Sequence, residues 1–221
     1  MSTLIQLTSQ HIQNLGHQRL KKHLETQTPY TVDVVMPYTK PTEAKQTAEL
    51  LMARAGTPMR LIALLDDAAL GFIQIANQVF QACANPYFVY LAQDAFPGRF
   101  WLRNALHTLQ QENKGLLAFN DGKWFGQLAA FGLVRRTWAS TVYEGPLFWH
   151  GYNSHYADTE LTVVAQSENQ LCYNPHAVLI EVDYMKDKRA THPADKQLFA
   201  ERKTLAFNGK VTHPELLNQF S

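Results

Sequence analysis

Four short apolar runs, separated by helical patterns, are the feature that most limits what this chain can form. The runs cover residues 31–36, 60–65, 87–92 and 116–119, and they are rich in β-branched, aromatic and leucine side chains. Helical patterns occupy residues 42–55 and 70–84, and a further helix with Pro97 in its first turn stops near Gly115. This β-α-β-α-β-α-β order predicts an α/β domain with a mainly parallel sheet flanked by helices.

The segments outside this core have weaker patterns. Residues 120–123 predict a turn, a helix is expected to start near Asp158, and residues 171–184 contain one or two short strands. Residues 8–24 and 193–206 have helical spacing. We therefore divide the chain into a helical extension (1–30), one core domain (31–185) and a helical tail (186–221).

Composition excludes several classes of protein. The 221 residues include 20 Lys and Arg against 19 Asp and Glu, and this near-balance argues against a protein that coats nucleic acid through bulk charge. The two cysteines, Cys83 and Cys172, are too few for a disulfide scaffold or a cysteine-rich zinc module. No apolar run reaches the roughly 20 residues of a membrane-spanning helix, and the N-terminus lacks a signal-peptide pattern. We expect a soluble cytoplasmic protein.

Carboxylates follow two of the predicted strands, Asp66-Asp67 after the second and Asp94 after the third. In open α/β sheets, ligands bind beyond the carboxyl ends of the strands. The sequence has no Gly-x-Gly-x-x-Gly, no phosphate-binding P-loop and no Gly-x-Ser-x-Gly elbow. A nucleotide would therefore be held through side chains and a divalent metal such as Mg²⁺ or Mn²⁺, which needs one or two carboxylates plus phosphate oxygens.

The order of these segments resembles the GT-A fold glycosyltransferases of the inverting family 2 type. The resemblance rests on Val34-Val-Met-Pro-Tyr38, Leu61-Ile-Ala-Leu-Leu-Asp-Asp67, Ala76-Asn77, Tyr87-Phe-Val-Tyr-Leu-Ala-Gln-Asp94 and Tyr156-Ala-Asp-Thr-Glu-Leu161. It covers roughly residues 31–184. The small size is also similar to compact bacteriophage glycosyltransferases, some of which modify hydroxymethylated DNA bases, and a phage protein would act in the host cytoplasm.

The resemblance implies a metal-assisted transfer, with inversion, of a sugar from a nucleotide diphosphate donor, by family habit a UDP-sugar, to an acceptor hydroxyl. Asp158 matches the catalytic base. The donor would be bound by Pro37, Tyr38, Thr39, Asp66, Asp67, Asn77, Gln93 and Asp94. Two departures weaken the match: Ala92 replaces the first Asp of the Asp-x-Asp metal motif, and Ala157 replaces the Glu that commonly precedes the base.

The metal ligands implied by the resemblance are Asp94, Asp183 and His192, with His150, His155 and His176 as further options. Flat aromatic side chains that would stack on an acceptor are Trp124, Trp149 and Tyr152. Arg135 and Arg136 are either surface residues or partners of a phosphate. The basic segments 19–22 and 186–189 could draw in a polyanionic acceptor.

Structural alternatives remain open for each carboxylate. Asp66 and Asp67 could cap the helix that follows them, Asp94 could be a turn residue, and Asp158 could simply favour a helix N-terminus. Two other functions also remain: a catalytically silent nucleotide-sugar binding module, favoured by Ala92, and a sugar nucleotidyltransferase. The latter usually has a Gly-rich signature after the first strand, which residues 37–41 lack.

Overall fold

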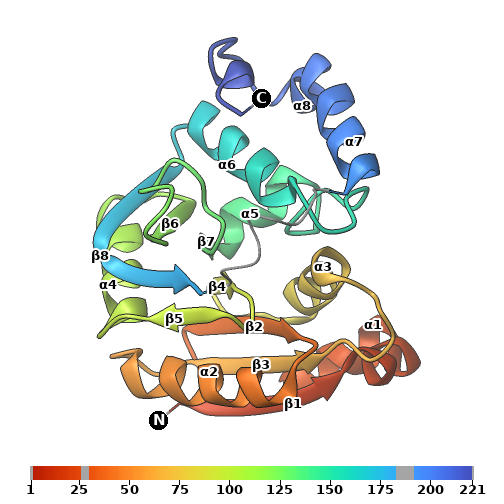
Figure 1. Ribbon diagram of the computed structural model, residues 1–221, viewed down its shortest axis with the longest axis vertical. Helices are drawn as coiled ribbons and strands as arrows, with labels where there is room; N and C mark the ends of the chain where they lie inside the picture. Colours follow the sequence, from red (N-terminus) through yellow and green to blue (C-terminus); the bar gives the residue numbers. More distant parts are fainter. Residues whose placement is uncertain (1, 26–29, 183–191, 221) are drawn as a thin grey trace.

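The computed structural model describes residues 2–25, 30–182 and 192–220. Its centre is one mixed sheet with strand order β1-β3-β2-β4-β7-β6-β8-β5 (Figure 1). The strands are β1 (Thr3–Thr8), β2 (Val32–Tyr38), β3 (Arg60–Leu65), β4 (Tyr87–Tyr90), β5 (Ala95–Pro97), β6 (Leu116–Asn120), β7 (Gly132–Arg135) and β8 (Leu171–Glu181). The helices are α1 (Ser9–Glu25), α2 (Pro41–Arg54), α3 (Phe72–Ala82), α4 (Trp101–Gln111), α5 (Arg136–Val142), α6 (Ala157–Ser167), α7 (Pro193–Thr204) and α8 (Ala206–Gly209), followed by a short 3₁₀ turn, Leu216–Asn218.

The first half of the sheet is parallel and the second half is mixed. Strands β1, β3, β2 and β4 are all parallel neighbours. Strand β7 runs antiparallel to both β4 and β6, β8 is parallel to β6, and β5 is antiparallel to β8. The predicted mainly parallel, helix-flanked sheet in a single α/β domain is therefore confirmed.

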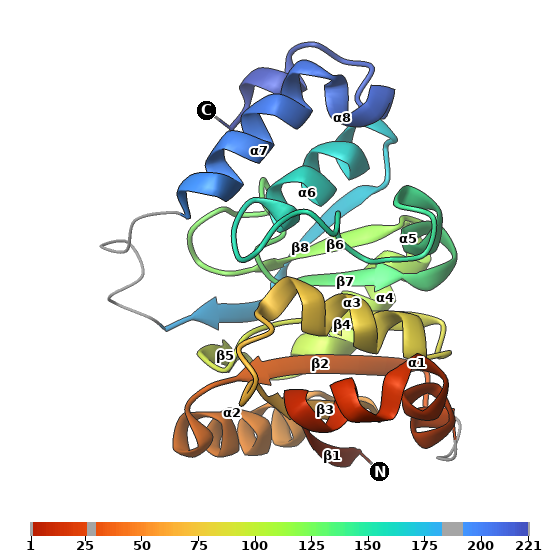
Figure 2. The ribbon, with the colours of Figure 1, turned by 90° about the vertical axis from the view of Figure 1, so that its right-hand side faces the viewer.

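Alternate residues of the strands pack against two different helical layers. Val34 and Met36 of β2 lie in the cluster formed with α2 and α4, whereas Val35 between them lies in the cluster formed with α1, α3 and α6. Figure 2 shows α3 and α1 over one part of the sheet and α7 and α8 beyond α6. Both faces of the central strands are buried, which explains their continuous apolar sequences.

The N-terminal segment contributes more than a helix. Residues 3–8, within the region assigned from sequence to a helical extension, form the edge strand β1, which pairs in parallel with β3. The helix expected from the spacing of residues 8–24 follows as α1, and it buries Ile12, Leu20 and Leu24 in the core of the domain. The helix therefore packs on the domain, and Gly16 marks a kink in it at φ 69°.

Two further strands of the sheet, β5 and β7, were not expected. Residues 95–97, placed from sequence near the start of a helix, form strand β5, and the helix α4 begins only at Trp101. Strand β7, residues 132–135, lies in a part of the chain for which no element was predicted. Residues 171–181, predicted to contain one or two short strands, form the single strand β8. Within the described residues, no helix combines the length and apolarity that crossing a membrane requires.

Candidate active site

A pocket opens at the carboxyl ends of β2, β3 and β4. Its volume is about 640 Å³. It is lined by Pro37, Tyr38, Thr39, Lys40, Glu43, Asp66, Gly71, Phe72, Ala92, Gln93, Asp94, Ser154 and Val182. This is the crevice where open α/β sheets bind ligands. Six of the residues predicted to bind the donor therefore lie together, namely Pro37, Tyr38, Thr39, Asp66, Gln93 and Asp94.

Asp66 is held beside this pocket by backbone amides. Its two carboxylate oxygens accept hydrogen bonds from the N–H groups of Leu70 and Gly71, both at 2.8 Å. Its own N–H donates to the carbonyl of Tyr38, which ties the end of β3 to the end of β2. Gly71 has φ 82°, a conformation that favours glycine. The carboxylate is thus fixed in place, and no cation in the described structure neutralises it.

Asp67 and Asn77 are not brought to this pocket. Asp67 accepts hydrogen bonds from Ser9 Oγ (3.0 Å) and the Gln10 N–H (2.9 Å), so it caps helix α1, which precedes it in sequence. These bonds, the Gln10 N–H first among them, lower the pKa of Asp67. Asn77 on α3 is buried, and its amide donates to and accepts from the backbone of Phe148. We therefore assign both side chains to the fold.

Gln93 connects the two loops that border the pocket. Its side-chain oxygen accepts the N–H groups of Thr39 (2.8 Å) and Lys40 (3.0 Å), and its carbonyl accepts the hydroxyl of Thr47. The loop after β2 is thereby fastened to the loop after β4. Asp94 follows directly, and its carbonyl accepts the N–H of Val182 at 3.0 Å. The side chain of Gln93 therefore holds together the two loops that form the wall of the pocket, and Asp94 lines the pocket.

Asp158 lies in the first turn of α6, near the end of β4. The N–H of Thr159 donates to its carboxylate at 2.9 Å. The pKa of Tyr90 on β4 is raised first by burial and second by the negative charge of Asp158, which is not among the residues that line the pocket. Tyr156, just before the helix, has φ 67°, an unfavourable backbone conformation for an aromatic residue. Strain of this kind persists only where the surroundings impose it.

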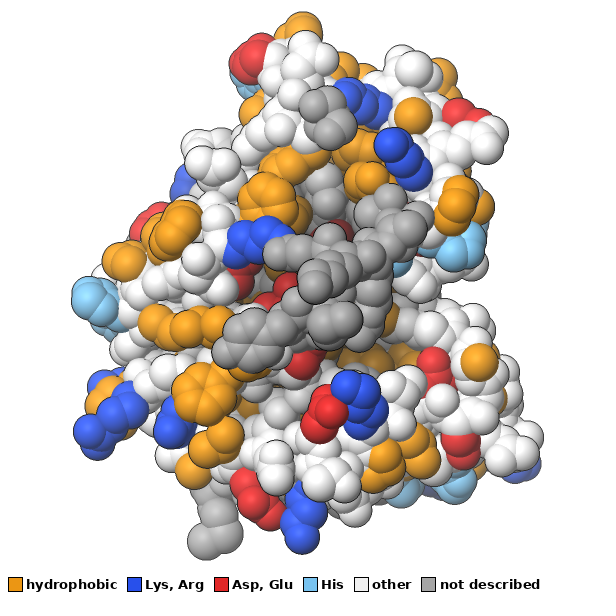
Figure 3. Space-filling view, viewed as in Figure 1, with side chains coloured by type: hydrophobic (Ala, Val, Ile, Leu, Met, Phe, Trp, Pro, Cys, Tyr) orange, Lys and Arg blue, Asp and Glu red, His pale blue; other side chains and the backbone are white. Residues whose placement is uncertain are grey.

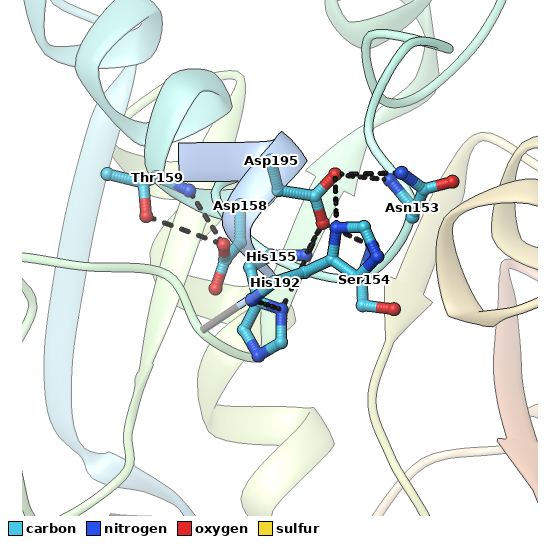
Figure 4. Close-up of polar contacts among 7 residues, drawn as sticks. All are labelled: Asn153, Ser154, His155, Asp158, Thr159, His192 and Asp195. Carbon is cyan, nitrogen blue, oxygen red and sulfur yellow. Dashed lines mark hydrogen bonds and ion pairs between the residues drawn. The ribbon is translucent and has the colours of Figure 1, made fainter. Parts of the chain in front are cut away.

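Helix α7 contacts the segment that leads into α6 and includes the strained Tyr156. The sequence patterns did not reveal this role of α7. The carboxylate of Asp195 accepts four hydrogen bonds from Asn153, Ser154 and His155, between 2.8 and 3.1 Å long (Figure 4). Burial alone would raise the pKa of Asp195, but the N–H groups of Asn153, His155 and Ser154 outweigh it, and the pKa is lowered. In addition, the ring of Tyr156 stacks on Phe199 of α7 at 4.8 Å.

A buried ion pair joins α7 to α6, and two of the aromatic residues proposed for acceptor binding contact it. Arg202 donates to both carboxylate oxygens of Glu160 at 2.6 Å. The hydroxyl of Tyr152 donates to Glu160 at 2.8 Å, and the Arg202 guanidinium lies 3.7 Å from the ring centroid of Trp149. Trp149 and Tyr152 therefore belong to a packed cluster rather than to an open surface.

The remaining aromatic and basic candidates also have structural partners. Trp124 is half-buried and lies against Phe220. Arg135 donates to the carbonyls of Lys114 and Leu109, and Arg136 donates to those of Asn85 and Phe80. Both arginines are half-buried, and their guanidinium groups donate to backbone carbonyls, so neither is the freely solvated surface residue considered from the sequence.

The metal ligands predicted from sequence are only partly described. Asp183 lies outside the described residues. The Nδ1 atom of His192 lies 4.0 Å from the Asp195 carboxylate. The backbone N–H of His192 donates a hydrogen bond to Nδ1 of His155 at 3.3 Å. In the described part of the chain, no group of three or more His, Cys, Asp or Glu side chains is arranged to hold a metal. The carboxylate of Asp94 in an open pocket fits Mg²⁺ or Mn²⁺ that takes its other ligands from a diphosphate and water.

Comparison with known proteins shows the fold and no closer relationship. No protein-family model matches the sequence, and no curated protein matches it. The structure is similar to S. aureus TarS 1–349 (11% identity, TM-score 0.55), over all of this chain and 70% of that one. The same TarS segment in complex with UDP gives 11% identity and a TM-score of 0.54, over 99% of this chain and 69% of that one.

A second neighbour is a mannosyltransferase, PcManGT from Pyrobaculum calidifontis, in complex with GDP-Man and Mn²⁺. It has 12% identity and a TM-score of 0.56, over 92% of this chain and 79% of that one. These neighbours are GT-A glycosyltransferases. The chain therefore has the GT-A fold, as the resemblance in its sequence implied.

Proposed function

We propose that the protein is a glycosyltransferase that uses a nucleotide diphosphate sugar, with a UDP-sugar as the first candidate donor. The observation that carries this proposal is the 640 Å³ pocket at the carboxyl ends of β2, β3 and β4, which brings Asp66, Gln93 and Asp94 together. The neighbours of this fold include one in complex with UDP and one in complex with GDP-Man and Mn²⁺. The inverting family 2 type is part of the same proposal.

Within the pocket, each carboxylate has a distinct role in the proposal. Asp66, fixed by two amide N–H groups, binds the nucleobase or ribose through hydrogen bonds. Asp94 is the ligand for Mn²⁺ or Mg²⁺, with Asp183 and His192 as further candidates. The metal, when bound, stabilises the negative charge that develops on the departing nucleotide diphosphate.

Asp158 is the proposed general base. It takes the proton from the acceptor hydroxyl as that oxygen attacks the anomeric carbon, and the bond to the diphosphate breaks on the opposite face of the sugar. Inversion follows from this single displacement. Its position at the start of α6 is set by the strained Tyr156 and by the four hydrogen bonds of Asp195 to residues 153–155.

The acceptor is a glycan, a lipid-linked sugar, a protein side chain or a modified DNA base. A hydroxymethylated base would accompany a bacteriophage origin and action in the host cytoplasm. Trp149 and Tyr152 are not proposed to bind the acceptor, because their side chains are engaged with Arg202 and Glu160. Trp124, half-buried beside Phe220, remains a candidate.

Donor hydrolysis and donor binding test the proposal together. With Mn²⁺, purified protein should release UDP from one of a panel of UDP-sugars, and UDP with Mn²⁺ should raise its melting temperature. Asp94→Ala and Asp158→Asn should each abolish turnover while the protein remains folded. Asp67→Asn is the matched control, because this neighbouring carboxylate caps α1 outside the pocket and its loss should leave turnover unchanged.

A silent binding module is the alternative favoured by Ala92, which lines the pocket where a second metal carboxylate is usual. That function predicts a nucleotide-induced rise in melting temperature without turnover of any UDP- or GDP-sugar. If neither binding nor turnover is detected with Mg²⁺ or Mn²⁺, the assignment of the pocket to nucleotide sugars is wrong.

A further inference from the structure

A row of exposed apolar side chains runs along the end of the sheet formed by β5 and β8. Phe96 pairs in register with Ile180, and the exposed fractions of these residues are 42% and 39%. Val182 follows two residues after Ile180 and is 41% exposed, and Phe100, just before α4, is 40% exposed. These four are the majority of the seven large exposed hydrophobic residues in the described structure. We call them, with the arginines described next, the β5 surface.

Three arginines flank this row. The guanidinium carbon of Arg54 lies 4.9 Å from the ring centroid of Phe96. The ring centroid of Phe100 lies 4.1 Å from the guanidinium carbon of Arg103 and 5.6 Å from that of Arg99. Among the described residues, none of the three arginines forms an ion pair with a carboxylate. In Figure 3, blue and orange side chains gather at the lower left, over β5 and the start of α4. The β5 surface is therefore apolar and locally cationic.

The position of Phe100 is costly for folding. Its backbone has φ 61°, in the left-handed region, which is unfavourable for a non-glycine residue. Its N–H donates to the carbonyl of Arg54 at 2.7 Å, which fastens the start of α4 to the end of α2. A Cβ on Gly56 would lie 2.8 Å from the Phe100 ring, so the turn after α2 is shaped around that ring. A strained backbone that keeps an aromatic ring exposed is typical of a functional position.

We propose that the β5 surface docks the protein on an anionic membrane. Phenylalanine and aliphatic side chains partition into the boundary between headgroups and acyl chains, while arginines interact with lipid phosphates. Three guanidinium groups without carboxylate partners supply the complementary charge. Single-stranded nucleic acid would also attract arginines and aromatic rings, but Ile180 and Val182 offer no flat face for stacking a base, whereas both are suited to hydrocarbon.

The surface is continuous with the candidate active site. Val182 belongs to the apolar row and also lines the pocket that contains Asp94. Docking through this surface would therefore bring the pocket mouth to the bilayer, where an acceptor carried by a lipid would be presented. Membrane binding itself does not depend on the proposed function, so it is testable without any sugar donor.

Vesicle sedimentation of the full chain tests this inference. The protein should bind vesicles of phosphatidylcholine mixed with phosphatidylglycerol and not vesicles of phosphatidylcholine alone, and salt should weaken the binding. Arg99→Gln and Arg103→Gln should each lower the partition coefficient about fivefold. Phe100→Asn should lower the partition coefficient about tenfold, because the variant lacks the exposed ring that would enter the bilayer. Asparagine tolerates a positive φ, so this variant should keep the wild-type melting temperature or exceed it.

Matched controls lie on other parts of the molecule. Arg19→Gln removes an exposed arginine from α1, and Leu205→Ser removes an exposed apolar side chain between α7 and α8. Both should bind vesicles like the wild type. Equal binding to the two kinds of vesicle, no binding to either, or equal losses in the control variants would overturn the proposal. Binding of a single-stranded oligonucleotide with the same arginine dependence, in the absence of vesicle binding, would assign the surface to nucleic acid instead.

Discussion

Two aspartates associated with neighbouring strands are held in opposite ways. Asp33 on β2 lies at the amino end of the sheet, is fully buried, and accepts hydrogen bonds from Arg60 Nε (2.7 Å) and Asn85 Nδ2 (2.8 Å). Asp66, after β3, lies at the carboxyl end beside the pocket, and its partners there are the N–H groups of Leu70 and Gly71. One carboxylate faces a cation and the other faces neutral donors.

The difference separates a charge that serves the fold from a charge that is available to a ligand. Burial alone would lower the pKa of Arg60, but Asp33 outweighs it and the pKa is raised, so the Arg60 guanidinium keeps its charge beside Asp33. Amide donors fix the Asp66 carboxylate without cancelling its charge. A ligand hydroxyl or an N–H group can therefore still bind it, and the same comparison predicts different consequences of mutation.

Loss of Arg60 should have the largest effect on stability. Arg60→Met leaves Asp33 as an uncompensated buried charge, which costs about 3–5 kcal/mol in the free energy of unfolding. Urea denaturation at neutral pH measures this loss. Nucleotide binding by the fraction that remains folded should be unchanged, because the pair lies at the end of the sheet opposite the pocket.

The double variant Asp33→Asn with Arg60→Met is the control for that prediction. It removes both charges, so the free energy of unfolding should recover in part relative to Arg60→Met alone. An additive loss in the double variant would show that Arg60 stabilises the fold through its packing and its bond to the Leu24 carbonyl rather than through Asp33.

Asp195 should have the next largest effect, because it combines features of both aspartates. Like Asp33 it is buried, and like Asp66 it is held by N–H groups. Asp195→Asn should lower the free energy of unfolding by about 2 kcal/mol, since hydrogen bonds to a charged group are lost. It should also lower the turnover number more than the affinity for the donor, because the loop leading to Asp158 loses its anchor.

The pH dependence of stability distinguishes the charge of Asp195 from its shape. Its pKa is lowered from 3.8 in the folded state, so its contribution is present above that value and is lost as the pH falls through the lower, folded pKa. The stability difference between wild type and Asp195→Asn should therefore shrink as the pH decreases below about 4. A difference that stays constant over this range would contradict the charge-based explanation.

The sequence predicted the parallel half of the sheet because periodicity there is strong. Continuous apolar runs such as those of β2 and β3 are what strands buried on both faces require, and Pro41 and Gly56 mark the limits of α2. Strand β5 was missed since its three residues are too few for any period to show, and the four residues of β7 were not singled out from sequence. Their pairing with distant strands, not their own sequence, makes them strands.

The candidate site was predictable only where chain order determines position. Carboxylates that directly follow neighbouring parallel strands meet at one edge, so Asp66 and Asp94 could be placed from sequence. Nothing local distinguished Asp66 from Asp67, since the choice depends on α1 offering its first N–H groups to Asp67. The contribution of Asp195 was hidden for the same reason, because its partners lie about 40 residues earlier in the chain.

Replacement of Asp66 should have the smallest effect on stability and a large effect on binding. Asp66→Asn keeps one acceptor oxygen but turns an NH₂ group toward an N–H donor, and the cost should be about 1 kcal/mol. In calorimetry with UDP and Mn²⁺, however, the affinity should fall at least tenfold, because a charged hydrogen bond to the nucleoside is lost. Asp67→Asn should bind UDP like the wild type. If instead Asp66→Asn binds UDP normally while Asp67→Asn does not, the assignment of these adjacent carboxylates to ligand and fold must be reversed.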